Sequence, residues 1–182
     1  IPLRLVGSEM CIRDSFYTRS FAETVRARLL PQIDVYGMNE DELQEYVGRS
    51  VNLLDQSDVI RALHEAQMII PARALVVHTR YWAIATGPDA GRHRAALDSA
   101  VRVAATRYRI GDRLTERDVE ETSDLPRHGG GQALVAAVED ALPDAVGVAA
   151  FSLDVASPTT VGLGDTFVGG FLAGAVRSRE TE

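Results

Sequence analysis

Apolar and polar residues follow two alternating periods along the chain, and these periods predict helices and strands in turn from residue 16 onward. Helical spacing of apolar residues predicts helices over residues 20–30, 40–47, 57–67, 94–108, 116–121 and 132–142, and a last apolar helix from Asp165. Short β-prone runs predict strands over residues 33–38, 74–79, 81–86 and 146–155, the last buried on both faces. This alternation indicates an α/β domain with a mostly parallel sheet flanked by helices.

Polar residues and glycines mark the ends of these elements. Asn39, Ser57 and Thr115 each precede a helical run as candidate N-caps. The glycines of residues 128–131 predict a flexible turn before the helix that starts at residue 132. Residues 159–164 are expected to form a loop, so that Asp165 begins the last helix.

Size and charge exclude several classes of function. The chain has 182 residues, enough for one domain with a core, and 46% of them are hydrophobic. The net charge of −7, with 19 basic residues that are all Arg, argues against a nucleic-acid surface and an anionic membrane. No run of about 20 apolar residues predicts a membrane span. We therefore expect a cytoplasmic protein without a nucleic-acid or membrane partner.

The first residues differ in character from the rest. The run from Arg4 to Ser15 resembles the translation of a sequencing adapter, so residues 1–15 are predicted to be a non-native segment and residues 16–182 the protein itself. This segment contains Cys11, the only cysteine of the chain. The remaining part would then have neither a disulfide nor a cysteine metal site.

A glycine-rich turn carries the strongest chemical signal. Gly162-Leu163-Gly164-Asp165 follows an apolar strand and opens a helix, where unpaired amides and the helix dipole favour an anion. Such amides could stabilise a phosphoryl group during its transfer, and Asp165 could accept the proton of an attacking hydroxyl. The four residues alone fit a plain capped helix start equally well. A dinucleotide-binding Gly-x-Gly-x-x-Gly turn is not matched, because Phe167 occupies the third glycine position.

The longer run from Thr160 to Thr166, followed by an apolar helix, resembles the ADP-dependent glucokinase/phosphofructokinase family of the ribokinase-like superfamily. The resemblance implies a ribokinase-like fold, here part of the large domain without its lid. It implies a phosphotransferase of a modified glycolysis that moves a phosphoryl group from ADP to a hydroxyl of glucose or fructose 6-phosphate. Asp165 would be the catalytic base, with Gly162, Leu163 and Gly164 as the anion hole.

Two further segments are similar to elements of that family. Asn39 and Glu42 match its Asn-x-x-Glu element, which implies that they organise Mg²⁺ and its waters; by themselves they also fit a helix cap and a first-turn acid. His78, at the end of a predicted strand, would contact the nucleotide, and Val155 would line the adenine pocket. Each of these two also fits an ordinary structural role.

Other candidates and other functions stay open at this point. Trp82 is expected in the core, and Arg102, Arg107 and Arg109 are expected on a solvated helix face. The family's His-x-Glu motif is absent, which indicates a truncated chain that could be inactive. The alternatives are an ATP-dependent sugar or nucleoside kinase of the wider ribokinase group and a non-catalytic nucleotide-binding protein of the same fold.

Overall fold

A computed structural model describes residues 5–6, 24, 27–28 and 30–180 of the chain. Its sheet has five strands in the order β1 (Leu5–Val6), β2 (Val35–Asn39), β3 (Ala74–His78), β4 (Trp82–Thr86) and β5 (Ala145–Ala149). The β1–β2 and β2–β3 pairs are parallel, whereas β4 is antiparallel to both β3 and β5. The sheet is therefore mixed, and β4 alone among these strands runs against the others.

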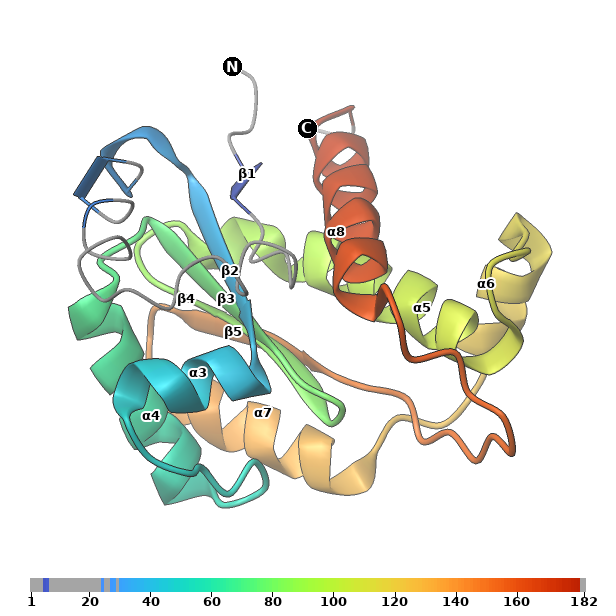
Figure 1. Cartoon of the computed structure of the whole chain (residues 1–182), viewed down its shortest axis with the longest axis horizontal. Coiled ribbons are helices and arrows are strands. Elements are labelled where there is room, and N and C mark those ends of the chain that lie inside the picture. The colour runs from blue at the N-terminus through green and yellow to red at the C-terminus, as the bar shows by residue number, and fades with distance from the viewer. Residues whose placement is uncertain (1–4, 7–23, 25–26, 29, 181–182) are drawn as a thin grey trace.

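Helices cover both faces of this sheet (Figure 1). On one face, α3 (Glu40–Val47), α4 (Gln56–Ile69) and α7 (Gly129–Ala141) pack around a core that includes Leu63, Trp82 and Leu134. On the other face, α5 (Arg94–Ile110) and α8 (Leu163–Glu180) enclose a second core with Leu97 and Phe171. The predicted α/β architecture with flanking helices is thus confirmed, as is the buried position of Trp82.

Several element ends agree with the local signals in the sequence. Asn39 caps α3, and Thr115 caps α6 (Glu116–Ser123) through a capping box with Asp118. Strands β3 and β4 form where two strands were predicted, and they pair as an antiparallel hairpin. Among the described residues, no helix has both the length and the apolar character that crossing a membrane requires. The predicted helix over residues 20–30 and the segment 1–15 lie largely outside the described residues.

Three predicted boundaries at helix starts are wrong. The N-cap of α4 is Asp55 instead of Ser57, because the Asp55 carboxylate accepts the Asp58 amide at 2.8 Å. Helix α7 begins inside the glycine run, where His128 Nδ1 accepts the Gly131 amide at 3.0 Å and so caps the helix. Helix α8 begins at Leu163, two residues before Asp165.

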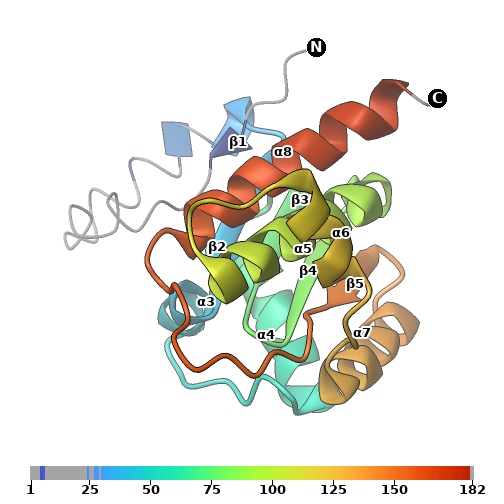
Figure 2. The same ribbon diagram turned by 90° about the vertical axis from the view of Figure 1, so that its right-hand side faces the viewer.

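The strand predicted over residues 146–155 is also shorter and less buried than expected. Strand β5 ends at Ala149, and alternate residues along it are only half-buried. Beyond it the chain leaves β4 and pairs with the segment before α7. The Ser152 amide donates to the Pro126 carbonyl, and Arg127 and Phe151 form an isolated β-bridge. The remaining residues form a loop that passes the end of α5 and leads to α8 (Figure 2).

Candidate active site

The glycine turn is built at the start of α8. Gly162 has a φ of 74°, a left-handed conformation that glycine adopts without a Cβ clash, and its carbonyl accepts the first helical hydrogen bond from the Thr166 amide at 3.1 Å. The amides of residues 163–165 consequently precede the helical ladder, and they have no acceptor among the described residues. Three unpaired N–H groups at the positive end of an 18-residue helix can bind an anion.

Asp165 lies in this first turn of α8. Its side chain is exposed, and no described residue forms an ion pair or hydrogen bond with it. The carboxylate is therefore accessible to a substrate hydroxyl and is not packed among apolar side chains. A kinase base requires this accessibility, because it must come within hydrogen-bonding distance of the attacking oxygen.

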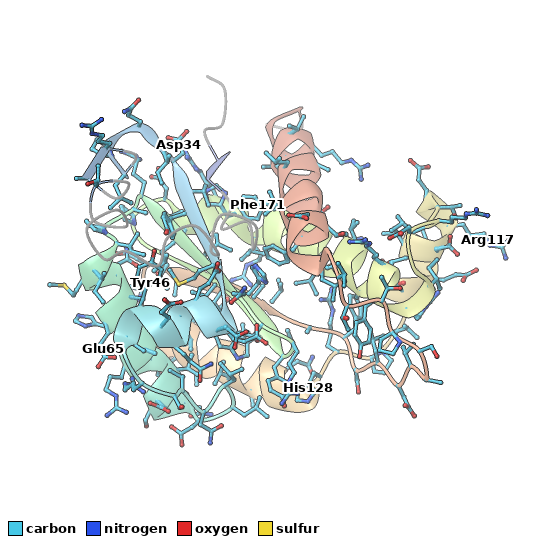
Figure 3. The ribbon with its side chains drawn as sticks, viewed as in Figure 1. Asp34, Tyr46, Glu65, Arg117, His128 and Phe171 are labelled. Carbon is cyan, nitrogen blue, oxygen red and sulfur yellow. The ribbon has the colours of Figure 1, made fainter. Side chains whose placement is uncertain are left out.

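The end of β3 contacts α8 close to this turn, and the end of β2 lies beside that of β3. Asn39 and His78 are register partners at the carboxyl ends of the two parallel strands. The His78 ring stacks on Phe167 of α8, with ring centroids 4.4 Å apart and planes inclined by 24°. Phe167 lies two residues after Asp165, so this stack joins the strand ends to the glycine turn. The stack and the β2–β3 register thus bring together three separate parts of the chain. Phe171, one turn along α8 from Phe167, is labelled in Figure 3 and lies in the core between α8 and the sheet.

Burial shifts the pKa of two groups near these strand ends. Burial lowers the pKa of His78 to about 4, because the packed ring cannot be solvated as a cation. His78 is therefore neutral near pH 7. Burial also raises the pKa of Glu40 at the start of α3. The hydrogen bond from its own backbone amide and the nearby Arg80 lower this pKa, whereas the charge of Asp41 raises it.

The Asn39–Glu42 pair forms a capping box. The Asn39 side-chain oxygen accepts the amides of Asp41 and Glu42, each at 2.9 Å, and a Glu42 carboxylate oxygen accepts the Asn39 amide at 2.8 Å. Glu42 is only 6% exposed. Among residues 30–180 no group of three or more His, Cys, Asp or Glu side chains could enclose a metal ion. The two amides already occupy the Asn39 oxygen, which argues against direct ligation of Mg²⁺ by Asn39, and a role of Glu42 towards a hydrated Mg²⁺ stays a prediction.

Arg107 also lies at this site, although the sequence predicted it on a solvated helix face. Its Nη1 donates to Thr166 Oγ1 at 2.9 Å, and its Nε and Nη2 donate to Asp112 Oδ1 at 2.9 and 2.7 Å. Its side chain is 20% exposed, so the solvated-face prediction is wrong. The only signal in the sequence was an Arg near the end of a long helix, which does not reveal a partner 59 residues away.

Val155 lies in the loop between β5 and α8 and is half-buried. It belongs neither to a strand nor to either of the two hydrophobic cores. Its assignment to an adenine pocket stays a prediction.

Comparisons with known proteins identify the fold. No protein-family model and no curated protein matches the sequence. Among solved structures, a phosphofructokinase from Pyrococcus horikoshii OT3 with AMP aligns with a TM-score of 0.73 at 20% identity, over 91% of this chain and 41% of that chain. The last common ancestor of ADP-dependent phosphofructokinases from Methanosarcinales aligns with a TM-score of 0.71 at 18% identity, over 88% of this chain and 40% of that chain.

A third similar structure is an ADP-dependent kinase in complex with fructose 6-phosphate and ADPβS, with a TM-score of 0.68 at 16% identity, over 87% of this chain and 42% of that chain. The chain therefore has the fold of the ADP-dependent phosphofructokinases and spans about two fifths of the length of these structures. At such identities the likeness establishes the fold, and chemistry has to be argued from the site.

Proposed function

We propose that this chain carries the phosphoryl-transfer centre of an ADP-dependent sugar kinase, with glucose or fructose 6-phosphate as the acceptor. The observation that supports this most is the start of α8, where three unpaired amides and an exposed carboxylate share one helical turn. Phosphoryl transfer depends mainly on positioning and on electrostatic stabilisation of the moving group, and this turn can supply both.

In this mechanism the amides of Leu163, Gly164 and Asp165 bind the terminal phosphate of ADP. The α8 dipole adds a positive charge equivalent to about half an elementary charge at that end of the helix. As the sugar hydroxyl attacks in line, negative charge develops on the phosphoryl oxygens, and the amides stabilise it without reorganising. The exposed Asp165 carboxylate orients the hydroxyl and accepts its proton.

The neighbouring strand ends would support nucleotide and metal binding. Mg²⁺ neutralises phosphate charge when it is bound with a nucleotide, and the Glu42 carboxylate would hydrogen-bond to its waters. Neutral His78 would present an uncharged ring to the nucleotide, and Val155 would contact the adenine. The similar phosphofructokinase structure contains AMP, and the similar kinase structure contains fructose 6-phosphate and ADPβS, which supports an adenine nucleotide and a sugar phosphate as the proposed ligands.

Two measurements test the proposal. ADP and ATP binding to the chain is measured by calorimetry in the presence of Mg²⁺, and transfer is followed with each nucleotide as donor and with glucose or fructose 6-phosphate as acceptor. We expect tighter binding and faster transfer with ADP. Asp165→Asn keeps the shape of the side chain but is a far weaker base, so transfer should fall by about 10²-fold or more while ADP affinity changes little.

Asp154→Asn is the matched control, because this carboxylate is also exposed but lies in the loop before the glycine turn. Equal transfer by the parent chain and Asp165→Asn would refute the assigned base. Faster transfer from ATP than from ADP would favour an ATP-dependent kinase of the wider ribokinase group. Nucleotide binding without any transfer by the parent chain or the variants would favour a non-catalytic binding protein.

A further inference from the structure

We propose that Arg107 is a positioning residue that fixes the phosphate-binding turn, an inference that rests on the proposed function of that turn. Arg107 lies one turn before the end of α5, whereas the turn belongs to α8. Its guanidinium donates to Thr166, whose hydroxyl in turn donates to the Gly162 carbonyl at 2.9 Å. A continuous hydrogen-bonded chain thus runs from α5 to the residue that gives the turn its shape.

The contact between the guanidinium and the turn is close. A Cβ at residue 162 would meet the Arg107 guanidinium, with Nη2 at 3.1 Å and Cζ at 3.2 Å. The arginine therefore lies directly against the side of Gly162 where any other residue would place its side chain. The left-handed φ of 74° favours glycine at this position, and any other side chain would displace the guanidinium from the turn.

The guanidinium is itself immobilised. Asp112 accepts two of its hydrogen bonds, and the opposite side of the guanidinium contacts Thr166. The planar fork of Arg suits two such partners at once, whereas the single ammonium group of Lys does not. Next to Arg107, the Tyr108 carbonyl accepts the Thr159 amide at 3.1 Å and so attaches the preceding loop to the same end of α5.

Through these contacts Arg107 can position the amides of the turn, which its positive charge alone could not do. Amides stabilise a transferring phosphoryl group only if they already point at it, because any reorganisation during reaction subtracts from the stabilisation. Arg107 holds the Gly162 carbonyl and Thr166 in place and thereby orients the amides between them. Its positive charge also adds to the attraction for a phosphate.

The test is Arg107→Gln with Arg109→Gln as the matched control. Arg109 is on the same helix, is exposed to a similar extent (23%) and pairs with Glu121 instead of the turn. Amide hydrogen exchange is measured by NMR on the ligand-free chain. We expect Arg107→Gln to speed exchange of the Thr166 amide by about ten-fold relative to the β3 amides, which report global unfolding. Arg109→Gln should leave that ratio unchanged.

A second pair of variants keeps the test valid if Arg107→Gln does not fold. Thr166→Val removes only the hydroxyl that joins Arg107 to Gly162, and it should produce the same selective loss of protection. In a double-mutant cycle with Arg107→Lys the two effects should be non-additive, because both break one hydrogen-bonded chain. Additive effects, or an unchanged Thr166 exchange ratio in every variant, would overturn the proposal.

ADP affinity separates positioning from charge. Arg107→Gln should weaken ADP binding by about ten-fold, and the loss should persist in about 1 M NaCl, where charges interact over only about 3 Å. A loss that disappears at high salt would assign Arg107 a purely electrostatic role and contradict positioning. If ADP does not bind the parent chain, the proposed function fails, while the exchange measurement still decides whether Arg107 fixes the turn.

Discussion

Substitution of Gly162 by Ala tests the geometry of the glycine turn most directly. An L-residue in the left-handed conformation of Gly162 costs about 1–2 kcal/mol. The new methyl group would also push the Arg107 guanidinium away from Thr166, and the loss of that charged hydrogen bond costs about 1.5–3 kcal/mol. Together these terms lower the free energy of unfolding by about 3 kcal/mol, which for a chain of this size lowers Tm by about 6–12 °C.

Gly164→Ala is the matched control within the same turn. A Cβ at Gly164 meets no atom within 4 Å, and the residue is already helical, so Ala should be neutral or stabilise the chain by up to about 1 kcal/mol. Thermal and urea denaturation followed by circular dichroism would measure both variants. If Gly162→Ala and Gly164→Ala unfold at the same temperature, the turn is not packed against Arg107 as described.

Two further predictions concern the helix pair and the half-buried His78. Gly174→Ala should destabilise the chain by about 1–3 kcal/mol, because its Cβ would lie 2.8 Å from the Ala96 Cα on α5. Gly169→Ala is the control and should not destabilise the chain, because its Cβ would meet no atom within 4 Å. Denaturation midpoints in the opposite order would contradict this packing. For His78, the folded state excludes the proton down to a pKa of about 4, while the unfolded chain binds it near pH 6.5. The neutral ring therefore costs no stability above about pH 7, and the folded chain loses about 3 kcal/mol of stability as the pH falls from 7 to 4. In urea unfolding, the free energy of unfolding of the parent should therefore fall relative to that of His78→Phe as the pH is lowered over this range. A difference between the two that does not change with pH would refute this prediction.

Local sequence signals predicted two helix starts that are set by interactions between residues three positions apart. The Asn39–Glu42 and Thr115–Asp118 capping boxes are of this kind, and both form at the predicted helix starts. The prediction failed at α7, where the glycines of residues 129–131 indicated a turn. There a tertiary contact prevails: a Cβ at Gly131 would strike the Tyr81 carbonyl, so the helix can approach β4 only with glycine at that position.

By itself the sequence determined the chemistry of one turn. Two glycines and an aspartate ahead of an apolar helix predict a turn with free amides and a carboxylate beside them, since helix ends depend only on neighbouring residues. Only the tertiary structure decided what surrounds that turn. Arg107 meets Thr166 across 59 positions because α5 and α8 pack together, and Asn39 lies beside His78 because of the β2–β3 register. Packing and register depend on the whole set of buried contacts, so no short pattern along the chain encodes them.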